Sequence, residues 1–332
     1  MSTVYGPVPS WRLGRSLGID VLLPPKKCTF NCVYCQLGKT RVQVSGPEML
    51  GETRVGVNEV VNDLDKILMR LDLDTVDVVT FSGTGEPTLN LRLGEIADQV
   101  KKKVGSIPLA ILTNSSLLCR KDVRKNLSRF DIVVAKLDAG DDETFRAINR
   151  PIDEKLNIET IVESIKRLKD AFRGTVALQV MLVRLKDRKV ANVEGKSLRN
   201  LIDAMLDVKP DQIQLDVPCR PPSEGFVKLP SKEKVKQIFD ELSRVFGEDR
   251  LWAYGLHDKR EKGVIWLSHE SLETQIIEML KRRPCRVVDV STSLGIDVST
   301  AQSLLRKLRK NRFVVTEMSE GEKYYSLGKR RS

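Results

Sequence analysis

Several features are scarce or missing in this 332-residue sequence. No apolar run approaches the roughly 20 residues that a membrane-spanning helix needs. The first seven residues lack the basic patch and apolar block of a signal peptide. Histidine occurs only twice, at His257 and His269. These absences argue against a membrane protein and predict a cytoplasmic one, in which six cysteines serve as metal ligands or catalytic groups rather than as disulfides.

Cysteine is concentrated at one place. Cys28, Cys32 and Cys35 fall within eight residues with the spacing Cys-x3-Cys-x2-Cys, and the next cysteine is Cys119. Structural zinc needs a fourth ligand, and neither histidine is near in sequence. A cubane [4Fe–4S] cluster on three thiolates leaves one iron open to an exogenous ligand, which is typical of a catalytic site. The spacing therefore favours a catalytic cluster over zinc or incidental cysteines.

The pattern of residues 18–246 predicts an α/β fold. Six β-rich runs alternate with amphipathic helical stretches, as in parallel strands joined by right-handed crossovers. The strands are expected at 19–23, 76–82, 109–114, 132–137, 176–183 and 212–217, and the helices at 57–71, 89–104, 120–129, 157–172, 195–208 and 231–246. In the last strand Gln212, Gln214 and Asp216 alternate with apolar residues, and Gln179 interrupts an earlier strand. A polar inner face favours an open barrel that holds a ligand over a doubly wound sheet.

The last part of the chain differs in charge and pattern. Residues 269–332 contain 13 Lys/Arg and 8 Asp/Glu, nearly half of the net excess of +11. Three short helices and a hairpin are expected there, which describes a winged helix-turn-helix domain. We therefore expect a barrel at 1–246, a connector at 247–268 and a winged-helix domain at 269–328. The hydrophilic face of its third helix offers candidates for nucleic-acid contact: Gln302, Arg306, Arg309 and Lys310.

The cysteine motif, with the aromatic Tyr34 just before its third cysteine, resembles the signature of the radical S-adenosylmethionine (radical SAM) superfamily. The resemblance implies a partial (β/α)6 barrel, a [4Fe–4S] cluster on Cys28, Cys32 and Cys35, and SAM on the open iron. It also implies reductive cleavage of SAM to a 5′-deoxyadenosyl radical that attacks a substrate. The electron would come from a low-potential donor of the ferredoxin or flavodoxin type.

Further motifs follow at later strand ends. Phe81-Ser82-Gly83-Thr84-Gly85-Glu86-Pro87 resembles the family's Gly-Gly-Glu-Pro element, with Thr84 in place of the second glycine. The resemblance implies that Gly83, Thr84, Gly85 and Glu86 receive the amino group of SAM, and that Tyr34, Asn114, Asp138 and Gln179 also lie near the cofactors. Candidates for substrate contact or catalysis are Lys136, Gln214, Asp216, Cys219 and Arg220. Two alternatives stay open for Lys136 and Arg220: binding of a substrate phosphate or carboxylate, and an ordinary surface or helix-capping charge.

Segments near both ends of residues 5–225 resemble a subgroup that includes the archaeal wyosine-base synthases. Those enzymes carry a second cluster on cysteines that precede the SAM motif, and here no cysteine precedes Cys28. The resemblance therefore does not extend to wyosine synthesis. Three readings stay open: a radical SAM enzyme acting on RNA, the same enzyme docking a protein or peptide through the winged helix, and a redox-sensing regulator that binds nucleic acid.

Overall fold

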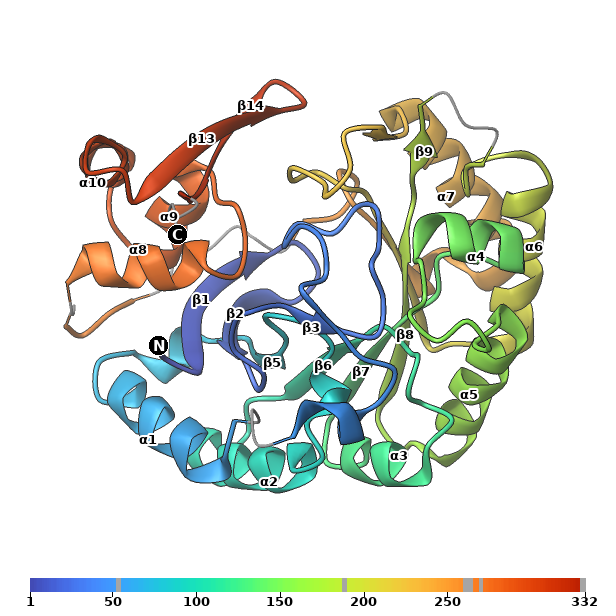
Figure 1. Cartoon of the computed structure of the whole chain (residues 1–332), viewed down its shortest axis with the longest axis horizontal. Helices are drawn as coiled ribbons and strands as arrows, with labels where there is room; N and C mark the ends of the chain where they lie inside the picture. Colours follow the sequence, from blue (N-terminus) through green and yellow to red (C-terminus); the bar gives the residue numbers. More distant parts are fainter. Residues whose placement is uncertain (52–54, 187–189, 259–264, 269–270, 329–332) are drawn as a thin grey trace.

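The computed structural model describes residues 1–51, 55–186, 190–258, 265–268 and 271–328. Its main element is an eight-stranded sheet that curls into a half-barrel, with helices along its outer side (Figure 1). Neighbouring strands are parallel except for the first two, which are antiparallel. In sheet order the strands are β1 (Val4–Ser10), β2 (Gly14–Ile19), β5 (Val78–Phe81), β6 (Leu109–Thr113), β7 (Ile132–Lys136), β8 (Thr175–Met181), β10 (Gln212–Asp216) and β12 (Leu251–Ala253).

The six parallel strands from β2 to β10 confirm the predicted series of β–α units, with one shift. The first strand was expected at 19–23, but β2 ends at Ile19. The carboxylate of Asp20 accepts hydrogen bonds from the backbone N–H groups of Leu22 and Leu23, both at 3.2 Å. This side chain therefore turns the chain out of the sheet one residue after the strand.

Two further strands flank these six and were not predicted. β1 contains Pro7 and Pro9, which argue against a central strand but are tolerated at a sheet edge. β12 lies in residues 247–268, which were expected to be a connector, and it pairs in parallel with β10. Three residues are too few to show a periodic pattern.

The helices of the barrel pack their apolar faces on the sheet, with Leu64, Ile96, Ile165 and Leu201 fully buried. Ser231 caps the last of them by accepting a hydrogen bond from the N–H of Lys234 at 3.2 Å. The helices are α1 (Val57–Leu68), α2 (Leu93–Val104), α3 (Lys121–Leu127), α4 (Asp142–Ile148), α5 (Ile158–Ala171), α6 (Gly195–Val208) and α7 (Lys232–Phe246). Short 3-10 turns lie at Pro47–Leu50, Leu73–Thr75, Pro87–Leu89 and Glu248–Arg250, and two-residue strands at β3 (Lys27–Cys28), β4 (Val42–Gln43), β9 (Arg184–Leu185) and β11 (Val227–Lys228).

Residues 271–327, here called the C-terminal module, contain three helices and a hairpin: α8 (Leu272–Leu280), α9 (Val287–Leu294), α10 (Val298–Lys310), β13 (Val314–Ser319) and β14 (Glu322–Leu327). Its apolar core includes Tyr5 and Val8 of β1. Helices α8 and α9 pack on β1, whereas α10 packs on α8, α9 and β13 on the side away from the barrel (Figure 1). The module and the N-terminal hairpin therefore share one core.

A buried ion pair also joins the module to the barrel. The Arg282 Nε lies 3.1 Å from the Asp20 carboxylate, and both side chains are almost completely buried. The Arg282 guanidinium also stacks on the ring of Tyr5, 4.5 Å from its centroid. Among the described helices, none is long and apolar enough to cross a membrane.

Candidate active site

The loop that carries the three cysteines follows β2 and lies across the mouth of the half-barrel. Its backbone is held by donors and acceptors from later parts of the chain. The N–H of Val33 donates to the carbonyl of Ile148 at 3.0 Å, and the hydroxyl of Ser223 donates to the carbonyl of Cys32 at 2.9 Å. The geometry of the loop therefore depends on segments up to 191 residues away in sequence.

The three thiols are free, and two of their sulfur atoms accept hydrogen bonds. Cys28 Sγ lies 3.5 Å from the Phe30 amide and 3.5 Å from Asn114 Nδ2, and Cys32 Sγ lies 3.7 Å from Asn149 Nδ2. Such donors favour the thiolate, the form in which cysteine binds a metal. The donor set on this loop therefore fits thiolate ligands.

Burial acts on the thiols in the opposite direction to these donors. Burial and the charge of Cys32 raise the pKa of Cys28 to about 12, and burial and Cys35 raise that of Cys32 to about 11. Thiols in this setting ionise when a metal supplies the missing positive charge. Among the described residues, no three His, Cys, Asp or Glu side chains converge on one metal-ion position. A cubane does not require this, because each thiolate binds a different iron.

A buried lysine beside the loop was not anticipated from the sequence. Lys26 is 7% exposed and donates from Nζ to the carbonyl of Gly38 at 2.8 Å. Burial by itself would lower its pKa, but the charges of Cys35 and Cys28 raise it above the ordinary value. Lys26 thus places a positive charge next to the thiols, and its position directly before the cysteine motif was the available signal.

Tyr34 and Asp138, both predicted near the cofactors, contact each other. The Tyr34 hydroxyl donates to the Asp138 carboxylate, which also accepts from Asn149 Nδ2 at 2.6 Å and from the Met181 amide at 2.8 Å. Lys136 Nζ lies 3.6 Å from the same carboxylate and 5.0 Å from the centroid of the Tyr34 ring. Asp138 therefore ties the cysteine loop to the ends of β7 and β8.

The Gly83–Pro87 turn packs directly under this loop. A side chain at Gly85 would place its Cβ 1.7 Å from the carbonyl oxygen of Lys27, so only glycine fits. Thr84 stands where the resembling family has glycine, and its hydroxyl donates to Asp20 at 3.0 Å. The substitution therefore joins the turn to the carboxylate that also holds Arg282.

Glu86, expected to meet the amino group of SAM, is buried at 2% exposure and already has four donors. They are the amide and hydroxyl of Thr88 at 3.1 and 2.6 Å, the hydroxyl of Thr113 at 2.8 Å and the amide of Asn114 at 2.7 Å. Burial raises its pKa, and these donors oppose the rise. In this structure Glu86 joins the ends of β5 and β6.

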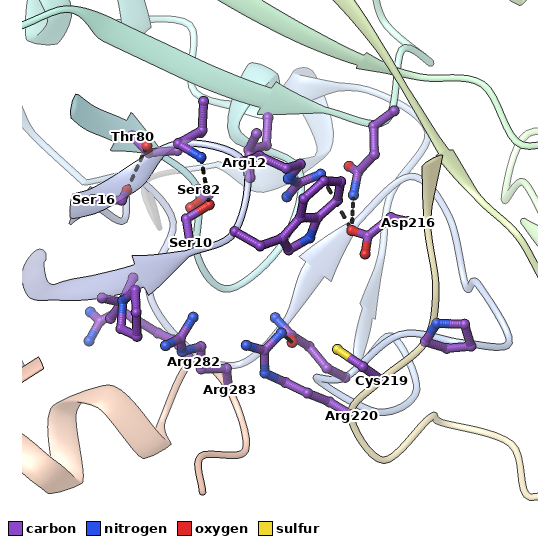
Figure 2. A pocket seen from close by; sticks show the side chains of 18 of the residues that line it. Ser10, Arg12, Ser16, Thr80, Ser82, Asp216, Cys219, Arg220, Arg282 and Arg283 are labelled. Carbon is purple, nitrogen blue, oxygen red and sulfur yellow. Dashed lines mark hydrogen bonds and ion pairs between the residues drawn. The ribbon is translucent and has the colours of Figure 1, made fainter. Parts of the chain in front are cut away.

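A cavity of about 330 Å³ opens beside the loop (Figure 2). Three separate parts of the chain form it. The barrel wall, made by the loop and the strand ends, comprises Tyr34, Cys35, Gly83, Gly85, Lys136 and Gln179. The turn of the N-terminal hairpin adds Trp11 and Arg12. The arginine wall, made by the segment after β10 and the C-terminal module, comprises Arg220, Arg283, Arg286, Asp289 and Tyr324.

The predicted substrate candidates divide at this cavity. Lys136, Asp216, Cys219 and Arg220 line it, whereas Gln214 is buried beside it and donates to Gln212. Asp216 accepts from Gln179 Nε2 at 2.8 Å and lies 3.4 Å from Arg12 Nη1. The alternation of polar residues along β10 and β8 thus predicted the polar interior.

The remaining cysteines and the nucleic-acid candidates lie outside the cavity lining. Cys119 is exposed, and Cys285 is fully buried in the core of the C-terminal module. Arg306, Arg309 and Lys310 are exposed on α10, with Gln302 partly buried. Because α10 lies on the far side of the module, these side chains are remote from the cavity (Figure 1).

Sequence reasoning missed Arg12, Arg283 and Tyr324 as cavity residues. The Tyr324 hydroxyl donates to the carbonyl of Cys219 at 2.8 Å and so fixes the module against the segment after β10. None of the three belongs to a motif. They meet only because the two ends of the chain fold over the same opening.

Several known proteins are similar to this chain. A model of the radical SAM superfamily matches residues 22–193. UPF0026 protein MJ1312 of Methanocaldococcus jannaschii is 30% identical over 292 residues, 86% of this chain and 84% of that protein. A protein named GTPase Obg from Brachyspira hyodysenteriae is 32% identical over 330 residues, 98% of this chain and 45% of that protein. The crystal structure of Streptococcus suis SuiB bound to S-adenosylmethionine has a TM-score of 0.48 and 15% identity, covering 71% of this chain and 50% of that one.

This chain belongs to the radical SAM superfamily, because the matched segment makes up more than half of its length. It is a radical SAM enzyme, its cofactors are a [4Fe–4S] cluster and SAM, and it requires a reductant. The chain spans about half the length of the Brachyspira protein and of SuiB. The activity and the ligand given in their names are therefore those of these two proteins.

Proposed function

We propose that Cys28, Cys32 and Cys35 bind the [4Fe–4S] cluster. The observation that carries this proposal is the loop itself, with three free thiols, N–H donors on two sulfur atoms and Cys35 at the cavity. Asn114 and Asn149 act as donors to the sulfur atoms, and Lys26 balances their charge. Tyr34 and Asp138 position the loop.

We propose that SAM binds along the barrel wall of the cavity. Gly83 and Gly85 expose backbone there, and Lys136 and Gln179 supply polar side chains. Thr84, Glu86 and Asn114 support this surface from behind through their hydrogen bonds. Together the bound cofactors supply the reductive cleavage of SAM to a 5′-deoxyadenosyl radical, with a ferredoxin- or flavodoxin-type protein as electron donor.

Anaerobic reconstitution tests the cluster residues. We expect about four irons and four sulfides per chain, and loss of both after replacement of Cys28, Cys32 or Cys35 by Ala. Cys119→Ala is the matched control, because this cysteine is exposed and outside the cavity. A full cluster in the triple variant, or one zinc without sulfide in the wild type, would contradict the proposal.

We further infer that residues 269–328 form a winged-helix domain and that its α10 contacts nucleic acid, RNA in particular. The supporting observation is the exposed row of Arg306, Arg309 and Lys310 on α10. Membership in an enzyme family favours this role over a redox-sensing regulator. A salt series with transfer RNA and duplex DNA tests the contact, and binding of neither would favour protein or peptide docking.

A further inference from the structure

The arginine wall of the cavity contains guanidinium N–H groups for which the protein supplies no acceptor. Arg283 Nε and Nη2 and Arg220 Nε are buried and donate to no hydrogen-bond acceptor among the described residues. The other contact of Arg220 is a weak one, from Nη1 to Gln36 Oε1 at 3.3 Å. Buried donors in folded proteins are almost always satisfied, so these atoms indicate a ligand.

Asp289 offsets only part of the positive charge of this pair. Arg283 and Arg220 interact with its carboxylate electrostatically and help to lower its pKa, but the hydrogen bonds to it come from Arg286, whose Nη2 donates at 3.2 Å. Arg282 differs from both, because Asp20 and Glu278 pair with it. Figure 2 shows Arg220 and Arg283 on one side of the cavity and Arg12 with Asp216 on the other. The excess positive charge therefore faces the cavity from the side opposite Asp216.

The shape of these groups limits the ligand. A guanidinium binds carboxylate or phosphate oxygens through two parallel N–H groups, and two guanidiniums together match a dianion. A cavity of about 330 Å³ lies at the lower end of the range for small-molecule sites. The exposed basic residues of α10 do not line this cavity, so the two arginines form a separate anion-binding position.

We propose that Arg220 and Arg283 bind the phosphate group of a small-molecule phosphate monoester, the substrate of this enzyme. The proposal rests on the proposed function, because it assigns the substrate class of the same cavity. Arg12, Asp216 and Cys219 then face the rest of the substrate. The C-terminal module thus completes the substrate site instead of only recruiting a partner.

The test uses the full-length protein and inorganic phosphate as the probe, with affinity measured by calorimetry at low ionic strength. We expect Arg220→Gln and Arg283→Gln each to weaken phosphate binding roughly 10- to 150-fold, the effect of losing a charge-assisted hydrogen bond. Arg309→Gln is the matched control, since it removes the same charge from the exposed face of α10 and should leave phosphate affinity unchanged. Arg283→Lys retains a positive charge and should lose less phosphate affinity than Arg283→Gln. This second variant keeps the proposal testable if Arg283→Gln fails to fold.

Further measurements distinguish a phosphate monoester from other ligands and separate this proposal from the cluster assignment. Succinate binding more tightly than phosphate, or a 5′-phosphorylated RNA binding more tightly than a nucleoside monophosphate, would overturn the assignment of a small phosphate monoester. Loss of SAM affinity in parallel with phosphate affinity would assign the arginines to SAM and overturn it too. The Cys28, Cys32 and Cys35 triple Ala variant should lose iron but keep phosphate binding, so failure of the cluster assignment remains distinguishable.

Discussion

The barrel wall and the arginine wall of the cavity treat buried charge in different ways. On the barrel side, the carboxylates of Asp138 and Glu86 are each held by three or four donors, although Lys136 Nζ is buried without a hydrogen-bond acceptor. On the arginine side, Arg220 and Arg283 keep buried N–H groups without acceptors. Satisfied carboxylates fix the geometry around them, whereas unsatisfied donors can bind a ligand. The contrast supports the two proposals, in which the barrel wall positions the cofactors and the arginine wall recognises the substrate.

Removing Arg282 should break the attachment between these walls and have the largest effect on stability. Arg282→Ala leaves the Asp20 carboxylate buried without its ion-pair partner, which costs about 3–5 kcal/mol. Urea titration followed by tryptophan fluorescence measures the loss in free energy of unfolding. Arg309→Ala is the control, because that side chain is exposed. A loss for Arg282→Ala no larger than for this control would show that the ion pair does not hold the module.

Glu86→Gln tests whether the hydrogen bonds to the Glu86 carboxylate stabilise the barrel side of the cavity. The glutamine amide nitrogen would replace one carboxylate oxygen and so face a donor, either the N–H of Asn114 or that of Thr88. Because a donor cannot accept from another donor, we expect a loss of about 3 kcal/mol in stability. In the folded variant, SAM affinity should fall less than about 10-fold. Unchanged stability with a larger fall in SAM affinity would instead support direct contact with SAM, as the sequence predicted.

The pH dependence of stability tests the electrostatic interaction of Asp289 with the arginine wall. Burial alone would raise its pKa, but Arg283, Arg220 and Arg286 lower it to about 2. A lowered carboxylate pKa stabilises the fold above the unfolded value near 3.8, and this contribution disappears as pH falls to about 2. Asp289→Asn should therefore cost about 2 kcal/mol at neutral pH. The difference from wild type should shrink below pH 4, and a difference that is constant down to pH 2 would contradict the pKa.

The barrel wall was largely predictable and the arginine wall was not, for a physical reason. The cysteines and the Gly83–Pro87 turn are contiguous motifs, and the polar face of β10 appears as strict alternation. Arg12 and Arg283 are 271 positions apart in the numbering and meet only because β1 enters the core of the C-terminal module. Sequence periodicity carries no information on a contact between segments so far apart in the chain. The hydrogen bonds of Glu86 could not be predicted from the sequence, because its donors come from Thr88, Thr113 and Asn114 on neighbouring segments.

The smallest effect on stability is expected on α10, outside both walls. Arg306→Ala and Arg309→Ala change exposed side chains and should each shift the free energy of unfolding by less than about 0.5 kcal/mol. If α10 contacts nucleic acid, each should also flatten the dependence of log affinity on log salt. The slope is about −0.9 per neutralised phosphate on duplex DNA and about −0.7 on single strands.

The full-length protein is required, because Tyr5 and Val8 of β1 belong to the core of the C-terminal module. RNA bound in preference to DNA would support an RNA substrate, sequence-selective duplex binding would support a regulator, and an unchanged slope in both variants would remove α10 from any nucleic-acid interface.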